Sequence, residues 1–370
     1  MSKTPKKILI VAMRQIGDTL ITTPLVSKAK KTWPDAKIHF LGFKNSLSIL
    51  EGNPDIEELI PCSQRPKLAE YFFLFKKLFK RYDLALITQP NDRSHIFGLL
   101  SAWQRFGVVP NDRKQGWWKR LFCDHVVEVD YFNQHVVTEK LKLIPNQSKG
   151  DDSGIFVTPP KQEALPPSLL MQINASDRKP IVIHASPLGS YKRISTQTWQ
   201  NVINELATNH LIILTGSNST VDQQLNSEIL EGILPHLTDQ VLNLSGQLSF
   251  SQTSTLLSMA KLYIGVDTSM SHLAAACDTP SIVLFGPTPP TNFGPWPNGF
   301  RGEQPYKLKS PIQTVGAITI IQGPGDCVPC RQAGCQNSLN SPSECLLKIS
   351  APTILAAIAS KNLVSTNLNK

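Results

Sequence analysis

Residues 262–287 constrain the fold of this chain more than any other stretch. They read as an apolar strand over residues 262–267, a short helix that begins near Thr268, and a second apolar strand that ends at Gly286-Pro287. Two apolar strands joined by a helix are typical of a parallel α/β sheet. Because the helix begins where the first strand ends, its unpaired N–H groups and the positive end of its dipole converge on one place, which suits a diphosphate.

Three polar residues lie at that place, namely Asp267, Thr268 and His272. Threonine is a natural N-cap, and a histidine one turn into the helix can reach a ligand bound at the helix end. The alternative is an ordinary capped corner, in which His272 only packs or hydrogen-bonds locally. The residue types alone leave both interpretations open.

The same alternation of strands and helices divides the chain into two halves. A length of 370 residues favours two domains over one, and a polar, proline-rich stretch over residues 159–180 separates the halves. The predicted strands cover residues 8–13, 37–43, 58–61, 83–88, 180–184, 211–216, 262–267 and 281–285, and the main predicted helices cover residues 22–33, 47–51, 68–81 and 198–207.

We therefore predict an α/β protein with a first domain over residues 1–165 and a second over residues 166–350. Residues 351–363 read as a last helix that either crosses back to the first domain or forms a free tail. Two such domains leave a cleft, and parallel sheets bind their ligands at the carboxyl ends of the strands. The candidate residues should therefore follow strands.

The charge of the chain indicates anionic partners. A net charge of +9 suits nucleotides, phosphorylated glycans or acidic membrane surfaces. The apolar run at residues 8–13 is stopped by Arg14 and Asp18 and has no small-residue cleavage site, so we interpret it as a strand of a cytoplasmic protein. No run is long enough to span a membrane, and no nucleic-acid-binding motif accompanies the basic segments.

The loop after the first strand, Arg14-Gln-Ile-Gly-Asp18, offers a carboxylate at a strand end. Gly17 permits a tight turn, and Asp18 suits proton abstraction. The alternative is an aspartate that only caps the next helix. No GxGxxG and no P-loop motif is present, which disfavours dinucleotide oxidoreductases and ATPases.

The loop after the first strand of the second half, residues 184–193, resembles a phosphate-binding loop. It combines small residues such as Ser186 with the cations Lys192 and Arg193. Cations on a loop are more often plain surface charges. His184 before this loop, and Thr215-Gly216 after the next strand, complete the candidates at strand ends.

Four of the seven cysteines gather late in the chain, at Cys327, Cys330, Cys335 and Cys345. Four thiolates could form a tetrahedral zinc site, although the spacing is tighter than in common zinc motifs. We favour reduced or loosely paired cysteines in a structural loop, in keeping with a reducing compartment.

Two segments are both basic and aromatic. Residues 68–81 predict a helix that either lies on a membrane surface or, as we favour, covers the first sheet with Phe72, Phe75 and Phe79 inward and its lysines outward. Residues 113–120 lack a clear helical period and are predicted to form a loop that faces either the cleft or solvent. In the cleft, Arg113, Lys119 and Arg120 could contact a phosphorylated glycan acceptor.

Several motifs together resemble the ADP-heptose:lipopolysaccharide heptosyltransferases, which form glycosyltransferase family nine. They run from about residue 7 to residue 350 and comprise Arg14-Gln-Ile-Gly-Asp18 with Pro24, Gly52-Asn-Pro-Asp-Ile56, Lys192 ahead of Trp199, and Gly265-Val-Asp-Thr with His272-Leu-Ala-Ala. Phe285-Gly-Pro287, Gly334-Cys335 and Ser343-Glu-Cys-Leu346 are most similar to the branch that adds the third inner-core heptose.

The resemblance implies a GT-B fold, with two Rossmann-like domains and inverting transfer that requires no metal cofactor. It implies that Asp18 is the general base and that Lys192 stabilises the leaving diphosphate of ADP-heptose. The donor would be bound by His184, Ser186, Lys192, Thr215, Gly216, Asp267, Thr268, Ser269 and His272. The acceptor, phosphorylated lipid A–core at the inner face of the inner membrane, would be bound by Arg14, Gly17, Arg113, Lys119 and Arg120.

Two departures from the family pattern bear on the donor. Ser269 stands where many relatives have glycine, and residues 216–224 offer only Asp222 as an acidic residue near the nucleoside. Two alternatives to a heptosyltransferase follow. One is a GT-B transferase with another nucleotide-sugar donor, and the other is an inactive module that binds a nucleotide or a metal.

Overall fold

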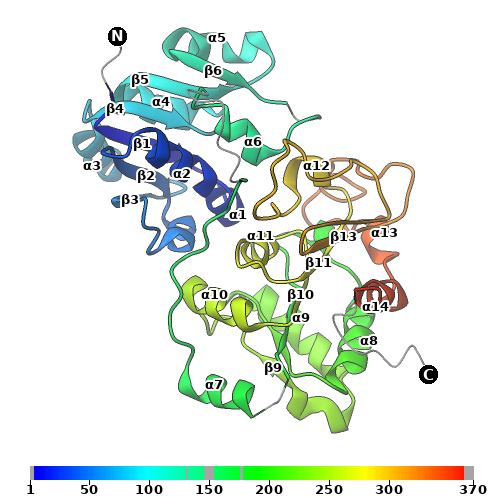
Figure 1. The fold of residues 1–370 in the computed structure, drawn as a ribbon. Coiled ribbons are helices and arrows are strands. Elements are labelled where there is room, and N and C mark those ends of the chain that lie inside the picture. The colour runs from blue at the N-terminus through cyan, green and yellow to red at the C-terminus, as the bar shows by residue number, and fades with distance from the viewer. Residues whose placement is uncertain (1–3, 131, 146–153, 176–177, 362–370) are drawn as a thin grey trace. The chain divides into compact units, whose positions relative to one another are not determined.

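The computed structural model describes residues 4–130, 132–145, 154–175 and 178–361 (Figure 1). The chain forms two compact units, Met1–Lys161 with Gly299–Gln304, and Gln162–Asn298 with Pro305–Lys370. The boundary therefore follows Lys161, where we predicted residue 165, and a six-residue segment of the second half returns to the first unit. An isolated bridge between Ile155 and Phe300 ties that segment in place.

The first unit is built on a six-stranded parallel sheet in the order β3-β2-β1-β4-β5-β6. Its strands are β1 Lys7–Ala12, β2 Lys37–Phe43, β3 Glu58–Cys62, β4 Tyr82–Ile87, β5 Ala102–Val109 and β6 His125–Glu128. Its helices are α1 Ile16–Leu20, α2 Thr23–Thr32, the 3₁₀ helix η1 Lys44–Leu50, α3 Leu68–Leu78, α4 Asp92–Ser101, α5 Arg113–Phe122 and α6 Val136–Leu141. Helices cover both faces of the sheet, so β1 is almost entirely buried and apolar.

The second unit holds a seven-stranded sheet in the order β12-β13-β11-β10-β7-β8-β9, parallel except for the β12–β13 pair. Its strands are β7 Ile181–His184, β8 Ile212–Leu214, β9 Val241–Asn243, β10 Leu262–Val266, β11 Ser281–Phe285, β12 Ile312–Val315 and β13 Ile318–Gln322. Its helices are α7 Pro167–Asn174, η2 Ser190–Lys192, α8 Thr196–Ala207, α9 Thr220–Glu231, η3 Pro235–Gln240, α10 Phe250–Met259, α11 Ser269–Ala276, α12 Pro290–Phe293, α13 Glu344–Leu347 and α14 Ala351–Ala359.

The α/β fold with two parallel sheets is confirmed, and every predicted strand forms. Three local predictions were wrong. Residues 113–120 lie in helix α5, which Asp112 caps by accepting a hydrogen bond from the Lys114 amide. The proline-rich stretch contains helix α7, which begins at Pro167, a residue that suits a first helical turn. Residues 47–51 fall at the end of a 3₁₀ helix.

The last described helix, α14, packs in the second unit. Ile354 and Ile358 are fully buried in the same core cluster as Trp199 of α8. The described part of the C-terminal segment is therefore not a free tail but packs within the second unit, and residues 362–370 lie outside the described residues. None of the helices described is long and apolar enough to cross a membrane.

Helix α3 does not bury the aromatic face that we predicted. Its buried side chains are Leu74 and Leu78, whereas Phe72, Phe75 and Phe79 are 60%, 41% and 50% exposed. The two leucines belong to the first unit's core, with Leu9 and Ile60. The helical period was right, but the larger apolar stripe faces away from the sheet.

Candidate functional site

In the second unit, two predicted donor residues form an ion pair at the carboxyl edge of the sheet. Strands β7 and β10 are neighbours, with His184 opposite Gly265, so the loops that follow them begin side by side. The Lys192 ammonium lies 2.6 Å from the Asp267 carboxylate. These side chains are only 21% and 9% exposed. The ion pair therefore places a half-buried cation at a strand end.

Helix α11 begins at the same edge, with Thr268 as its N-cap residue. The threonine side chain makes no capping hydrogen bond. The turn is held instead by Ser271, whose hydroxyl donates to the Val266 carbonyl at 2.7 Å and lies 3.1 Å from the Tyr263 hydroxyl. The backbone amides of the first turn are thus positioned without the threonine hydroxyl, which suits an anion at this helix end.

Three further donor candidates follow β7 and β8. His184 Nδ1 lies 3.1 Å from the Thr215 hydroxyl, and burial lowers the pKa of His184 to about 4, so the ring is neutral at pH 7. The Ser186 hydroxyl is buried and, among the described atoms, has no hydrogen-bond partner. A β-carbon on Gly216 would lie 2.8 Å from the Ser245 hydroxyl, so a larger residue would have to displace Ser245. A ligand oxygen would satisfy Ser186.

Asp222, the acidic residue considered for the nucleoside, has a local structural role. Its carboxylate accepts from both the amide and the hydroxyl of Ser217, at 2.7 Å each. These bonds fix the turn between β8 and α9.

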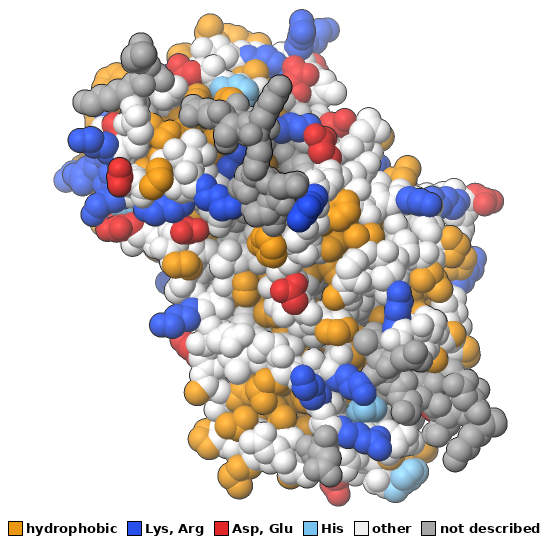
Figure 2. Space-filling model, in the orientation of Figure 1, with side chains coloured by type: hydrophobic (Ala, Val, Ile, Leu, Met, Phe, Trp, Pro, Cys, Tyr) orange, Lys and Arg blue, Asp and Glu red, His pale blue; other side chains and the backbone are white. Residues whose placement is uncertain are grey.

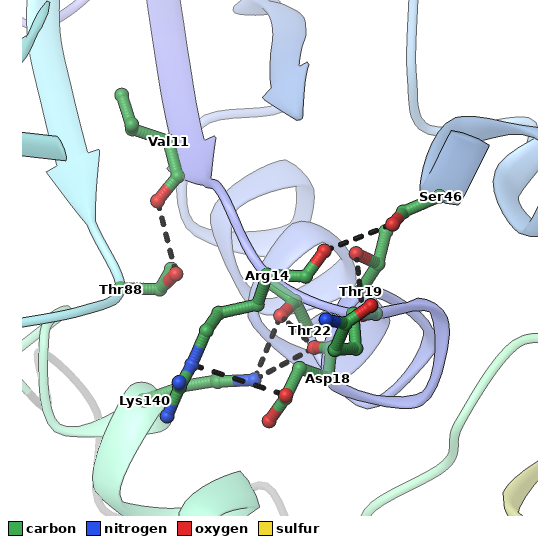
Figure 3. A network of polar contacts seen from close by, with 9 residues as sticks. Val11, Arg14, Asp18, Thr19, Thr22, Ser46, Thr88 and Lys140 are labelled. Atoms are coloured by element: carbon green, nitrogen blue, oxygen red, sulfur yellow. Dashed lines mark hydrogen bonds and ion pairs between the residues drawn. The ribbon is translucent and has the colours of Figure 1, made fainter. Parts of the chain in front are cut away.

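In the first unit, Asp18 lies in α1, immediately after β1 (Figure 3). Its carboxylate is 24% exposed and lies 3.9 Å from Arg14 Nε. The N-cap residue is Gln15 in α1 and Thr22 in the following helix α2, so Asp18 is not the capping residue of the alternative interpretation. The Asp18 carbonyl accepts hydrogen bonds from the Thr22 hydroxyl at 2.7 Å and from Lys140 Nζ at 2.9 Å.

Lys140 of α6 is a site residue that sequence reasoning missed. It also donates to the Thr22 hydroxyl at 2.8 Å, as Figure 3 shows. Burial lowers the pKa of its ammonium to about 8, and the nearby Asp18 charge partly opposes that effect. Nothing in the sequence marks this lysine, because it lies far from Asp18 along the chain and belongs to no motif.

Gln89 was missed as well. It follows β4, the neighbour of β1, and Thr88 beside it donates both its amide and its hydroxyl to the Val11 carbonyl (Figure 3). The Gln89 amide group is buried, and neither its nitrogen nor its oxygen has a partner among the described atoms. Two unpaired polar atoms at a strand end are typical of a ligand site.

The basic residues of α5 are engaged within the first unit. Lys119 is buried and lies 2.8 Å from the Asp92 carboxylate. Arg120 donates to the Pro110 carbonyl at 2.6 Å and pairs with Glu128 at 2.9 Å. Arg113 is exposed. The first two side chains therefore hold α5 in place, which the loop interpretation did not anticipate.

The late cysteines, which we considered as a zinc site, lie near one another. All seven cysteines of the chain are free thiols, and burial raises the pKa of Cys345 to about 11. Across the described ranges, no three His, Cys, Asp or Glu residues come together so as to hold a metal ion. The segment that contains the cysteines contacts the loop that carries Lys192. The Ser343 hydroxyl donates a hydrogen bond to the carbonyl of Tyr191, the residue before Lys192, at 2.6 Å.

Solved structures define the class of protein. The glycosyl transferase family 9 protein of Veillonella parvula has a TM-score of 0.72 at 15% identity, covering 97% of this chain and 98% of its own. E. coli heptosyltransferase WaaC, solved with ADP, has a TM-score of 0.68 at 19% identity, covering 96% and 99%. WaaC was also solved with ADP-2-deoxy-2-fluoro heptose. The fold is therefore that of the GT-B glycosyltransferases, with two Rossmann-like units.

The sequence comparison narrows this class to one family. The family described as "Glycosyltransferase family 9 (heptosyltransferase)" matches residues 72–302. Lipopolysaccharide heptosyltransferase 3 of Escherichia coli is 30% identical over 300 residues, which cover 77% of this chain and 85% of the relative. The chain belongs to glycosyltransferase family 9 and is a glycosyltransferase.

Proposed function

We propose that this enzyme transfers a heptose from ADP-heptose to the inner core of lipopolysaccharide, with inversion at the anomeric carbon. The observation that carries the proposal is the Lys192–Asp267 pair at 2.6 Å beside the start of α11. It supplies a cation and helix-end amides where a leaving diphosphate requires them. The E. coli relative heptosyltransferase 3 and the ADP complex of WaaC support this choice of acceptor and nucleotide.

In this mechanism Asp18 is the general base. Its carboxylate accepts the proton of an acceptor hydroxyl as the hydroxyl oxygen attacks the anomeric carbon of the heptose. The bond from that carbon to the diphosphate oxygen breaks, and ADP leaves with the electron pair. The ammonium of Lys192 and the amides of α11 stabilise the charge that develops on the diphosphate, so the reaction requires no additional cofactor.

The remaining candidate residues are divided between the two units according to the substrate that each would bind. On the second unit we assign His184, Ser186, Thr215, Gly216, Thr268, Ser269 and His272 to the donor. On the first unit we assign Arg14, Gly17 and Arg113 to the acceptor. Lys119 and Arg120 instead hold α5 in place through their contacts within the first unit. A phosphorylated lipid A–core acceptor would bring the enzyme to the cytoplasmic face of the inner membrane.

Calorimetric titration with ADP, UDP, GDP and CDP in the presence of EDTA tests the donor assignment. We expect selective binding of ADP, at least about tenfold weaker in Lys192→Ala because a charged hydrogen bond to phosphate is lost. Lys307→Ala, at an exposed lysine of the same unit, is the matched control. Preference for another nucleotide would favour a different donor, and absence of nucleotide binding would overturn the proposal.

A further inference from the structure

Helix α3 carries a second apolar face that stays exposed in the part of the unit that the structure describes. Leu74 and Leu78 bury one face. A stripe at intervals of three and four residues, Leu68, Tyr71, Phe72, Phe75 and Phe79, is between 41% and 89% exposed. An amphipathic helix of a globular protein normally needs one apolar face, so the exposed stripe has no role in the core.

The exposed stripe continues onto neighbouring elements. Ile96 of α4 is 49% exposed, and Trp103 of β5 is 69% exposed. A cavity of about 250 Å³ opens within this surface, between α3 and α4, lined by Tyr71, Phe75, Arg93, Ile96, Phe97 and Leu100. The exposed apolar surface therefore spans α3 and α4, and the recess between them bears one cation, Arg93, which donates to the Gln64 carbonyl at 2.7 Å.

Cations surround and interleave with the aromatic side chains. Residues 65–81 contain six Lys and Arg residues and a single acidic residue, Glu70. Lys76 Nζ lies 4.5 Å from the centre of the Phe72 ring, and Lys80 Nζ lies 4.4 Å from that of Trp103. Glu70 is turned away, because its carboxylate accepts a hydrogen bond from the Ser63 amide. Figure 2 shows Lys and Arg side chains, with Asp and Glu side chains among them, on the side of the first unit where α3 and β3 lie.

We propose that this α3 surface, formed by Leu68, Tyr71, Phe72, Phe75, Phe79, Ile96 and Trp103 with its surrounding cations, docks the enzyme on a bilayer of anionic phospholipid. Aromatic rings favour the interface between headgroups and acyl chains, while lysines reach anionic headgroups. Glu58 of β3 pairs with Lys77 at 2.6 Å, so with Glu58 and Glu70 counted against the six cations, four positive charges remain. This excess of positive charge favours an anionic bilayer over an apolar protein groove.

Docking on a bilayer rests on the proposed function, because an acceptor that is linked to lipid lies at a bilayer surface. The docking proposal and the proposed transfer reaction can be tested independently. Docking is measured with vesicles that contain neither donor nor acceptor, and transfer is measured on a soluble, de-acylated acceptor without vesicles.

Co-sedimentation of the full chain with vesicles of phosphatidylcholine, with and without phosphatidylglycerol, tests the docking. We expect binding only to the anionic vesicles, decreasing with added salt. The double variants Leu68→Ser/Phe72→Ser and Lys67→Glu/Lys76→Glu should each bind at least about tenfold more weakly. Their folds should persist, because all four side chains are exposed. Met171→Ser, at an exposed methionine of α7, is the control.

Quenching of tryptophan fluorescence by brominated lipid locates the inserted surface. Quenching that is largely lost in Trp103→Phe would support docking through the α3 surface. Equal binding to neutral and anionic vesicles, binding that both double variants retain, or absence of binding would overturn the proposal. A concentration-dependent dimer that Leu68→Ser/Phe72→Ser abolishes, without vesicle binding, would instead make this surface an interface between copies.

Discussion

The contacts that fix Asp18 act mainly on its backbone. The Thr22 hydroxyl and the Lys140 ammonium both donate to the Asp18 carbonyl, and the carboxylate remains partly exposed beside Arg14. A general base needs this combination of a fixed main chain and an accessible carboxylate. Asp18 could be selected from the sequence because it follows a strand, whereas the residues that hold it could not.

Replacing Asp18 by Asn should remove the proton acceptor and keep the shape of the side chain. We expect kcat to decrease by about 10²- to 10⁴-fold, the usual contribution of a general base. The affinity for ADP should stay unchanged, because the donor residues lie in the other unit. Steady-state kinetics and calorimetry together measure both effects, with Asp35→Asn at an exposed turn as the control. A variant with normal kcat would exclude Asp18 as the base.

Lys140 predicts a pH dependence of stability. Its pKa is about 8 in the folded protein, against 10.5 for an ordinary lysine. Between these values the unfolded chain binds more protons than the folded chain, so this group makes the free energy of unfolding rise with pH. Below about pH 8 both states are protonated, and the cost of burying the ammonium is fully present.

The Lys140→Met variant should lack this dependence. In urea unfolding followed from pH 7 to pH 10.5, the stability difference between wild type and variant should therefore shift in favour of wild type as the pH increases. Lys114→Met, at an exposed position of α5, should show a constant difference. A constant difference for Lys140→Met as well would show that this lysine titrates normally.

Helix α5 was predicted as a loop, and this difference in secondary structure changes the roles expected of Lys119 and Arg120. On a loop, Lys119 and Arg120 would be available to an acceptor. On a helix, one face must pack, and the structure places Lys119 there, against Asp92 and the Pro90 carbonyl. The glycine at position 116 and the two tryptophans hid the helical period, because neither type is a strong helix former.

Lys119→Met should consequently weaken the first unit more than it affects acceptor binding. We expect a loss of about 1–3 kcal/mol in the free energy of unfolding, because the Pro90 carbonyl and Asp92 lose a charged donor. The KM for acceptor should change less than about threefold, since the ammonium of this side chain is engaged by Asp92 and the Pro90 carbonyl. Chemical unfolding and acceptor titration measure the two effects, with Lys114→Met again as the control. A large increase in KM at unchanged stability would restore Lys119 to the acceptor site.

Over the whole molecule, local patterns predicted eight strands of the two sheets but missed β5, β6, β9, β12 and β13. They also could not predict how distant segments add to the two units. Apolar runs bounded by turn residues predicted β2 and β11 with the bounds that the structure has. The return of residues 299–304 to the first unit and the packing of α14 on α8 depend on contacts between residues far apart in sequence. The same is true of the site, where Lys192 and Asp267 could be proposed separately and Lys140 could not be proposed at all.

Because the candidate donor and acceptor residues lie in different units, each substrate should slow hydrogen exchange in a different part of the chain. In hydrogen exchange followed by mass spectrometry, saturating ADP should slow exchange in residues 184–193 and 265–273, which contain Lys192, Asp267 and the first turn of α11. Residues 14–22 and 86–94, around Asp18 and Gln89, should exchange as before until a soluble acceptor is added. Lys192→Ala should reduce only the effect of ADP. Protection that ADP alone causes only around Asp18 would place the donor on the first unit and reverse the assignment of the two sites.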